Sequence, residues 1–104
     1  MKEGYIYIMT NKNKTVMYVG VTANLTRRVY EHKNHEIKGS FTDHYNCEFC
    51  VYYEKFNDIK QAIDRETQLK NWNRDKKITL IDSKNPDWIE LVKDTEIINI
   101  EDLT

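Results

Sequence analysis

The chain has 104 residues, 39% of them hydrophobic and 32% charged, which is typical of one small globular domain with its own core. It contains no apolar run of about 18 residues, so the sequence predicts no transmembrane helix. The N-terminal Met-Lys-Glu-Gly lacks an apolar signal core, and we therefore expect the protein in the cytoplasm. The formal charge of −1 argues mildly against a nucleic-acid partner.

The charge is unevenly distributed along the chain. Residues 1–93 hold all 16 Lys and Arg residues against 13 acidic residues, a formal charge of +3. Residues 94–104 carry four acids, no base and three isoleucines. We therefore expect a folded domain over residues 1–93 and an acidic C-terminal tail over 94–104. The tail could pair with a sheet edge, bind a protein partner or a second copy, or stay loose.

Turn residues and hydrophobic periods divide the chain into short elements. The expected order is a strand hairpin at 4–10 and 15–22, a helix at about 25–35, a loop to 46, a strand at 47–56, a helix after Asp58, a third helix from Asn73 or Asp75 to 81, and a last helix from Asn85-Pro86 to 92. The order β-β-α-β-α-α-α predicts a small α/β (α+β) domain with a three-stranded antiparallel sheet flanked by helices.

The helix that follows the hairpin carries unusual residues near its apolar face. Asn24 is a favourable N-cap, and Leu25 and Val29 mark the inward side. At about 100° per residue, Arg28 and His32 lie within about 60° of that side, whereas Arg27 points away. A charged residue near an interior is costly unless it is paired or used. Arg28 is therefore either in a structural ion pair or in a phosphate-binding site.

A carboxylate interrupts the next apolar stripe in the same way. Ala62, Ile63 and Leu69 form the inward face of the helix after Asp58, and Glu66 lies in the middle of that face. A buried salt bridge to Arg28 is one explanation of its position. The other is a metal ligand, because hard divalent ions such as Mg²⁺ take carboxylate oxygens and often only one or two from protein.

Three motifs in this order resemble the signature of the GIY-YIG endonuclease family. They are Tyr5-Ile6-Tyr7, Tyr18-Val19-Gly20 and Arg28-Val29-Tyr30-Glu31-His32, with Tyr5 in place of the family's first glycine. The segment from Arg65 to Trp72 resembles the helix that carries the family's metal-binding glutamate. The resemblance covers about residues 5–91 and is greatest to the small single-domain branch, which is similar to the N-terminal nuclease domain of excision-repair endonucleases.

The resemblance implies a catalytic set of Tyr7, Tyr18, Arg28, His32 and Glu66. Glu66 is expected to hold a single Mg²⁺ or Mn²⁺, Arg28 to grip the phosphate, and either Tyr7 or Tyr18 to activate the attacking water. His32 is expected as a proton relay or a phosphate donor. From the residues alone, buried tyrosines are usually core residues and a lone helical histidine is usually structural.

A basic and aromatic group near the end of the glutamate helix is compatible with a groove that follows a nucleic-acid backbone. Its members are Lys70, Trp72, Arg74, Lys76 and Lys77, and Arg27 is a further candidate for a backbone contact. The alternative is a solvated helix end, where the helix dipole favours cations in any case. Asn71 and Asn73 are candidates for the asparagine that the family often adds after this helix.

Cys47 and Cys50 form a lone C-x-x-C in a strand-like run, and we expect reduced, buried packing residues. Their spacing with His44 matches no common zinc site. His35 and His44 are expected at the surface.

The resemblance therefore implies a metal-dependent endonuclease that hydrolyses phosphodiester bonds of DNA, including branched or damaged DNA, with RNA as an open alternative substrate. The alternative function is a non-catalytic module that binds nucleic acid or protein on a nuclease fold.

Overall fold

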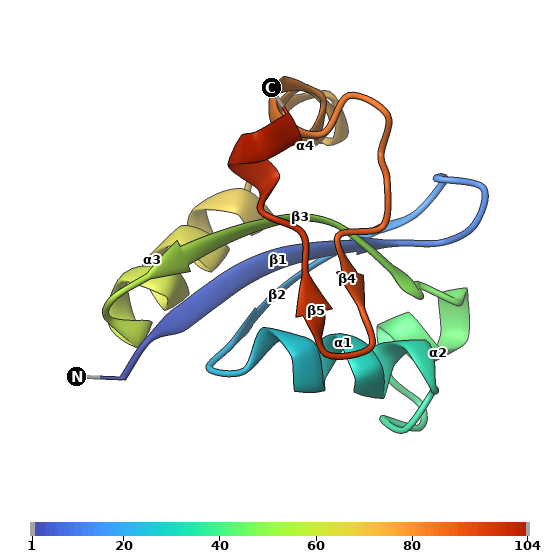
Figure 1. The fold of residues 1–104 in the computed structure, drawn as a ribbon. Coiled ribbons are helices and arrows are strands. Elements are labelled where there is room, and N and C mark those ends of the chain that lie inside the picture. Colours follow the sequence, from blue (N-terminus) through green and yellow to red (C-terminus); the bar gives the residue numbers. More distant parts are fainter. Residues whose placement is uncertain (1, 104) are drawn as a thin grey trace.

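The computed structural model describes residues 2–103 (Figure 1). Its elements are β1 (Gly4–Thr10), β2 (Met17–Thr22), α1 (Leu25–Lys33), α2 (Phe41–Tyr45), β3 (Phe49–Phe56), α3 (Ile59–Lys70), α4 (Arg74–Lys84), β4 (Val92–Lys93), β5 (Glu96–Ile97) and the 3₁₀ helix η1 (Ile100–Leu103). Among the described residues, no helix combines the length and the apolar character that a membrane crossing requires.

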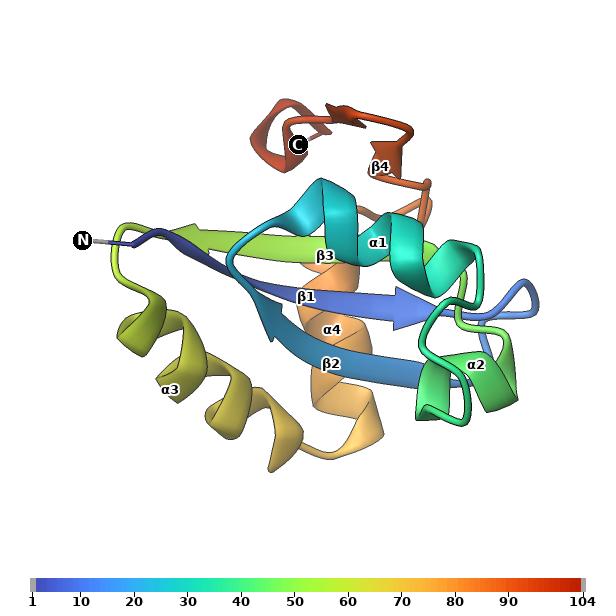
Figure 2. The ribbon, with the colours of Figure 1, turned by 90° about the horizontal axis from the view of Figure 1, so that it is seen from below.

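A three-stranded antiparallel sheet in the order β2-β1-β3 forms the centre of the fold (Figure 2). The central strand β1 is buried on both faces, and Ile6, Tyr7, Ile8 and Met9 have no exposed surface. The pairing of β1 with β3 shifts register between Ile8 and Met9, at a β-bulge. With its covering helices, the sheet confirms the predicted fold class.

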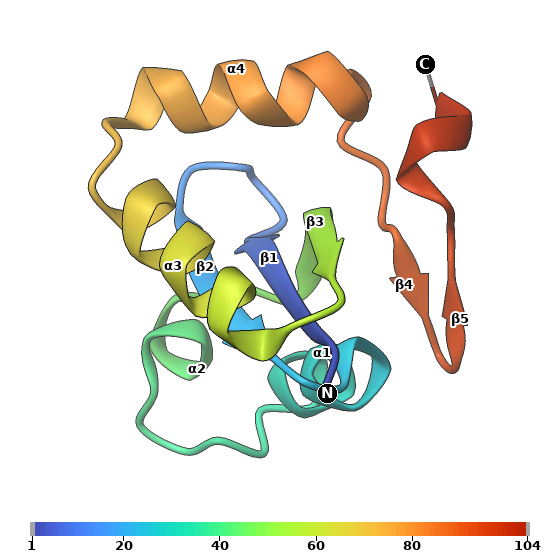
Figure 3. The same ribbon diagram turned by 90° about the vertical axis from the view of Figure 1, so that its left-hand side faces the viewer.

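Helices cover both faces of the sheet. In Figure 3, α4 lies above the strands, and α1 and α2 lie below them. The helix α3 packs against all three strands. Gly4 allows this close packing, because a Cβ atom at this position would come within 2.9 Å of the Ile59 Cα atom in α3. The neighbouring strands thereby cover the two edges of β1, and the helices cover its two faces.

Residues 41–45, which we expected in a loop, form the short helix α2. Ser40 caps it, because its Oγ accepts a hydrogen bond from the Asp43 N–H at 3.2 Å. Asn46 ends it in the left-handed conformation with φ of 56°. The helix is one turn long, so a hydrophobic period could not reveal it.

The prediction of a helix after Asn85-Pro86 is wrong, because residues 85–91 form no helix. Asn85 is instead the C-cap of α4, and its buried side chain organises the turn that follows. Its Nδ2 donates to the Val51 and Ile89 carbonyls at 2.9 and 3.0 Å, and its Oδ1 accepts from the Ile89 N–H at 3.1 Å. The chain then runs beside β3, where the Leu91 N–H donates to the Cys50 carbonyl at 2.9 Å. These backbone bonds exclude a helix here.

The acidic tail folds back onto the domain. The strands β4 and β5 form a small hairpin, and the Ile98 N–H donates to the Leu91 carbonyl at 2.7 Å. The Tyr53 hydroxyl donates to the Ile98 carbonyl at 2.9 Å and accepts from the Ile100 N–H at 3.2 Å. Ile100 is buried. The structure therefore shows a tail that is packed against the outer side of β3 and is not loose.

Candidate active site

The hairpin places two tyrosines on one face of the sheet. Tyr7 pairs with Gly20, and Met9 pairs with Tyr18, so Tyr7 and Tyr18 project to the same side from diagonal positions. Their ring centroids are 6.3 Å apart. Tyr7 has no exposed surface, whereas Tyr18 is half-buried. The strand register therefore brings the two tyrosines to one face of the sheet.

Gly20 leaves the space that the Tyr7 ring occupies. A Cβ atom at this position would lie 2.4 Å from the Cζ and Oη atoms of Tyr7 and 2.9 Å from Cε2 of Tyr18. Both distances to Tyr7 are far below van der Waals contact, so a larger residue would displace the hydroxyl end of that ring. The glycine of the second motif therefore sets the position of Tyr7 Oη.

The helix α1 brings a histidine to the buried tyrosine. Asn24 caps the helix by accepting from the Arg27 N–H at 3.1 Å, and Leu25 and Val29 are buried on its inner side. His32, one turn after Val29, is also buried. A hydrogen bond of 2.8 Å joins its Nε2 to Tyr7 Oη. The helical phase expected for His32 is thus the observed one.

The far nitrogen of the imidazole is held by a residue that sequence reasoning missed. A hydrogen bond of 2.8 Å joins His32 Nδ1 to Oγ1 of Thr42, which is buried in α2. Thr42 Oγ1 in turn lies 3.1 Å from Ser40 Oγ. The pattern Ser40-x-x-Asp43 resembles a helix-capping box and could have revealed α2 and with it Thr42.

The environment keeps both members of the tyrosine–histidine pair uncharged. Burial, and then the nearby positive charge of Arg28, lower the pKa of His32 from 6.5 to about 4. Burial raises the pKa of Tyr7 above its ordinary value of 10, and Tyr18 adds to this shift while Arg28 opposes it. At neutral pH the hydrogen bond therefore joins an uncharged phenol to an uncharged imidazole, and the imidazole has one nitrogen that can still take up a proton.

Arg28 lies at the open side of this cluster and pairs within its own helix. Its Nε donates to Glu31 Oε1 at 3.1 Å, and Glu31 Oε2 lies 3.6 Å from Nε of Arg27. The Arg28 side chain is 39% exposed and that of Arg27 is 76% exposed. The salt bridge between Arg28 and Glu66 that the sequence left open is not the observed pairing, because Glu31 takes that place.

Glu66 lies on a different helix from Arg28 and His32. It lies on α3 between Ala62 and Leu69, which are both fully buried, and its own side chain is 17% exposed. Its Oε2 is 3.5 Å from Nζ of Lys70. Within residues 2–103, no hydrogen bond or ion pair joins Glu66 to Tyr7, Tyr18, Arg28 or His32. The structure thus groups four of the five expected catalytic residues and leaves Glu66 on the adjoining helix.

The donor set is suited to a single hard cation. A half-buried carboxylate with one weak ion pair can give oxygen ligands to a divalent ion that keeps water and phosphate as its other ligands. No group of three or more His, Cys, Asp or Glu side chains that could enclose a metal occurs in the described part of the chain. Glu66 therefore fits a shared metal site completed by substrate better than an all-protein cage.

The basic residues after Glu66 have different environments. The Trp72 ring has Arg65 Cζ at 5.2 Å and Lys76 Nζ at 4.9 Å from its centroid. Trp72 and Lys76 also line a cleft of about 470 Å³ beside α4. Arg74 instead donates to the carbonyls of Thr15 and Lys14 at 2.9 and 3.3 Å, which ties α4 to the β1–β2 turn.

The remaining polar candidates have mostly structural positions. Asn73 caps α4 by accepting from the Lys76 N–H at 2.9 Å, and Asn71 is the exposed C-cap of α3. Lys70 is exposed and Lys77 is half-buried. Cys47 and Cys50 are free and buried, and burial raises the pKa of both thiols, to about 11 and 12. The prediction of reduced packing cysteines is confirmed.

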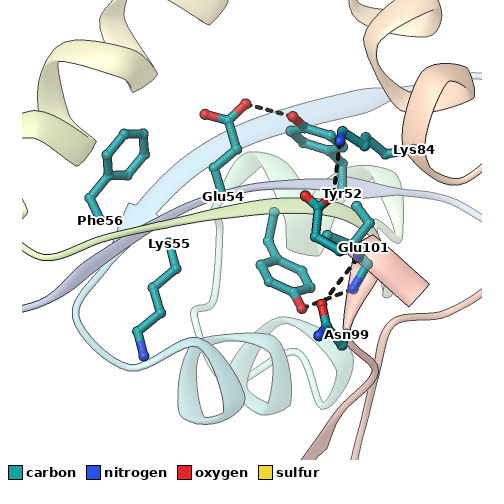
Figure 4. A pocket seen from close by; sticks show the side chains of 9 residues that line it. Tyr52, Glu54, Lys55, Phe56, Lys84, Asn99 and Glu101 are labelled. Carbon is teal, nitrogen blue, oxygen red and sulfur yellow. Dashed lines mark hydrogen bonds and ion pairs between the residues drawn. The ribbon is translucent and has the colours of Figure 1, made fainter. Parts of the chain in front are cut away.

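A separate cleft of about 480 Å³ lies on the outer side of β3, between α4 and η1 (Figure 4). There the Tyr52 hydroxyl donates to Glu54 Oε2 at 2.5 Å, and Lys84 Nζ pairs with Glu101 Oε2 at 3.0 Å. The expected catalytic residues do not line this cleft. It is therefore not the candidate active site.

The family model described as the GIY-YIG catalytic domain matches residues 3–79. The chain therefore belongs to the GIY-YIG catalytic domain family, which is a family of nuclease-type domains.

The relatives of this chain are small proteins of similar length. A UPF0213 protein of Syntrophus aciditrophicus is 30% identical over 87 residues, which are 84% of this chain and 98% of that protein. A UPF0213 protein of Clostridium perfringens is 33% identical over 81 residues, 78% of this chain and 85% of that protein. The solution NMR structure of a UPF0213 protein from Bacillus halodurans shares the fold, with a TM-score of 0.54 at 23% identity over 90% of this chain and 98% of that one.

Proposed function

We propose that the protein is an endonuclease that hydrolyses phosphodiester bonds of DNA by attack of water, with Tyr7, Tyr18, Arg28, His32 and Glu66 as its catalytic set. The observation that carries this proposal is the buried hydrogen bond of 2.8 Å between Tyr7 Oη and an uncharged His32. A phenol of raised pKa is a poor base alone, but it becomes effective when a neighbouring imidazole takes its proton.

The proton balance of this pair is complete. Tyr7 Oη accepts a proton from the attacking water while its own proton passes to His32 Nε2. This requires the tautomer in which His32 Nδ1–H donates to Thr42 Oγ1. The imidazolium that forms is unfavourable beside Arg28, so it depends on the negative charge that develops on the phosphate. Both ring nitrogens are occupied, which favours the relay role of His32 over a direct phosphate contact.

Tyr18 and Arg28 form the accessible side of the site. Tyr7 has no exposed surface, so water reaches its hydroxyl only when the site opens as substrate binds, and the half-buried Tyr18 ring is one of its neighbours. The Arg28 guanidinium offers a planar fork that fits two phosphate oxygens, and Glu31 holds it in place by the 3.1 Å bond to Nε. Substrate binding, water positioning and charge neutralisation thereby fall to different side chains.

Enzymes of this family generally use a divalent metal, and Glu66 would hold a single Mg²⁺ or Mn²⁺, which would supply Lewis-acid stabilisation of the negative charge that develops during hydrolysis. Lys70 and Trp72, with Lys76, Lys77 and Arg27, are proposed as contacts to the nucleic-acid backbone. Arg74 is proposed to contribute mainly by holding α4 against the hairpin turn.

A cleavage assay on plasmid, linear and branched DNA, and on RNA, with Mg²⁺ and with Mn²⁺, tests the proposal. Glu66→Ala and Arg28→Ala should each lower the cleavage rate at least 100-fold. Asp64→Ala is the matched control, because Asp64 is an exposed carboxylate on the same helix, and its activity should equal that of the wild type.

Activity that survives in Glu66→Ala contradicts the metal-ligand role. Binding of nucleic acid by the wild type without cleavage in any metal supports the binding module instead, for which the complete burial of Tyr7 is the favouring observation.

A further inference from the structure

Three aromatic rings lie in series from the candidate active site to the surface of α2. The rings of Tyr18 and Phe41 are stacked, with centroids 5.9 Å apart and planes 27° apart. The rings of Phe41 and Tyr45 follow at 4.7 Å. We call Tyr18, Phe41 and Tyr45 the aromatic shelf. Its inner end is Tyr18, whose ring centroid is 6.3 Å from that of Tyr7, and its outer end lies on α2, below the sheet in Figure 3.

The packing of the domain does not account for the exposed part of the shelf. Phe41 and Tyr45 occupy positions i and i+4 of α2, so they share one side of that helix, and each is 44% exposed. The helix is held by other residues, namely the buried Thr42 and the Ser40 cap. Large aromatic side chains exposed together beside a site are typical of a binding surface.

We propose that the aromatic shelf stacks an unpaired base of the strand that is cut, so that the substrate is a nucleic-acid strand with an unpaired base next to the scissile phosphodiester. This proposal rests on the proposed nuclease function. Every base presents a π-face, so stacking on aromatic rings tolerates any sequence. Bases inside a duplex are already stacked and cannot reach the shelf without being extruded. The shelf therefore selects single strands, or the single-stranded part of a branch, over intact duplex.

The acidic side chain of α2 is held by its own partners. Asp43 is the only acid in α2, and both of its oxygens are occupied. Oδ1 is 2.9 Å from His35 Nδ1, and Oδ2 accepts from the Gly39 N–H at 2.9 Å. These partners lower the pKa of Asp43, while Asp43 and Glu48 together raise the pKa of His35 and favour its positive charge. Arg28, the proposed phosphate contact, lies near Tyr7, whose ring neighbours the inner end of the shelf.

Equilibrium binding without divalent metal tests the shelf separately from cleavage. The probes are a fluorescent single-stranded oligodeoxynucleotide, its RNA equivalent, the same strand with abasic sites, and the matched duplex. Phe41→Ala and Tyr45→Ala should each weaken binding of the single strand about 5- to 150-fold, the range expected for the loss of one stacked base. Binding of the duplex and of the abasic strand should change little.

Tyr30→Ala is the matched control, because Tyr30 is an exposed aromatic residue on α1 outside the shelf, and it should bind the single strand as the wild type does. Thermal unfolding of each variant identifies any loss caused by misfolding.

Unchanged single-strand affinity in both shelf variants overturns the proposal, and so does an equal loss of affinity for the duplex. If the shelf variants bind and cut the single strand as the wild type does, the base-stacking role of the shelf is contradicted and the nuclease function is not. Selective single-strand binding by a wild type that cuts nothing contradicts the nuclease function and leaves the shelf intact. A wild type that binds no nucleic acid overturns both proposals.

Discussion

Acidification below pH 6.5 should destabilise the protein through His32, which stays uncharged in the native state at a pH where most histidines are already protonated. The pKa of His32 falls from 6.5 in an unfolded chain to about 4 in the native state. Between these two values the unfolded chain takes up a proton that the native protein does not. The stabilising contribution is therefore fully present above pH 6.5 and is lost as the pH falls toward 4. At about 1.4 kcal/mol per pH unit, the loss amounts to about 3 kcal/mol.

Urea unfolding of the wild type and of His32→Gln, from pH 7.5 to pH 4, measures this contribution. The glutamine cannot titrate, so the difference in unfolding free energy between the two proteins should narrow by about 3 kcal/mol over that range. The pair of His35 with Asp43 and Glu48 also responds to pH, but it is present in both proteins and cancels. An NMR titration of the His32 ring should place its midpoint near pH 4. A midpoint between 6 and 7, or a difference that is constant with pH, refutes the reasoning.

Two further substitutions test the geometry around Tyr7. Gly20→Ala should displace the Tyr7 ring, lower stability by about 1–3 kcal/mol and lower the cleavage rate, while binding of Mn²⁺ at Glu66, measured by EPR, stays unchanged. Loss of Mn²⁺ binding would show a general distortion instead. Thr42→Val keeps the shape of the side chain but leaves His32 Nδ1 without a partner, at about 1–3 kcal/mol. It should mix the His32 tautomers in ¹⁵N NMR spectra, and Thr42→Ser should restore the single tautomer; identical spectra for all three proteins would contradict the role of Thr42.

Local rules predict much of the site because much of it is local. The Asn24 cap fixes where α1 begins, and the helical period then turns Arg28 and His32 inward and Arg27 outward. Strand alternation gives the shared side of Tyr7 and Tyr18 for the same reason. These relations hold over a few residues and depend on the backbone alone.

Features that depend on tertiary contacts could not be predicted from the sequence. Asn85 precedes a proline, a pattern that favours the start of a helix, but its side chain satisfies three backbone groups and bends the chain along β3 instead. Thr42 bonds His32 across a loop that has no hydrophobic period. The partner of Glu66 is its neighbour Lys70 rather than the distant Arg28, because Glu31 pairs with Arg28 one turn along α1.

The bonds of Tyr53 to the tail also bear on how the protein folds during synthesis. Its hydroxyl bonds Ile98 and Ile100, which follow Tyr53 by 45 and 47 positions in the chain. The two bonds therefore close long loops, and closing them costs conformational entropy. These partners leave the ribosome after all three strands of the sheet, so the outer side of β3 stays uncovered until they have emerged and folded back. A nascent chain held at this stage has the complete Tyr7–His32 pair between β1 and α1, and an open strand edge where another nascent chain can pair.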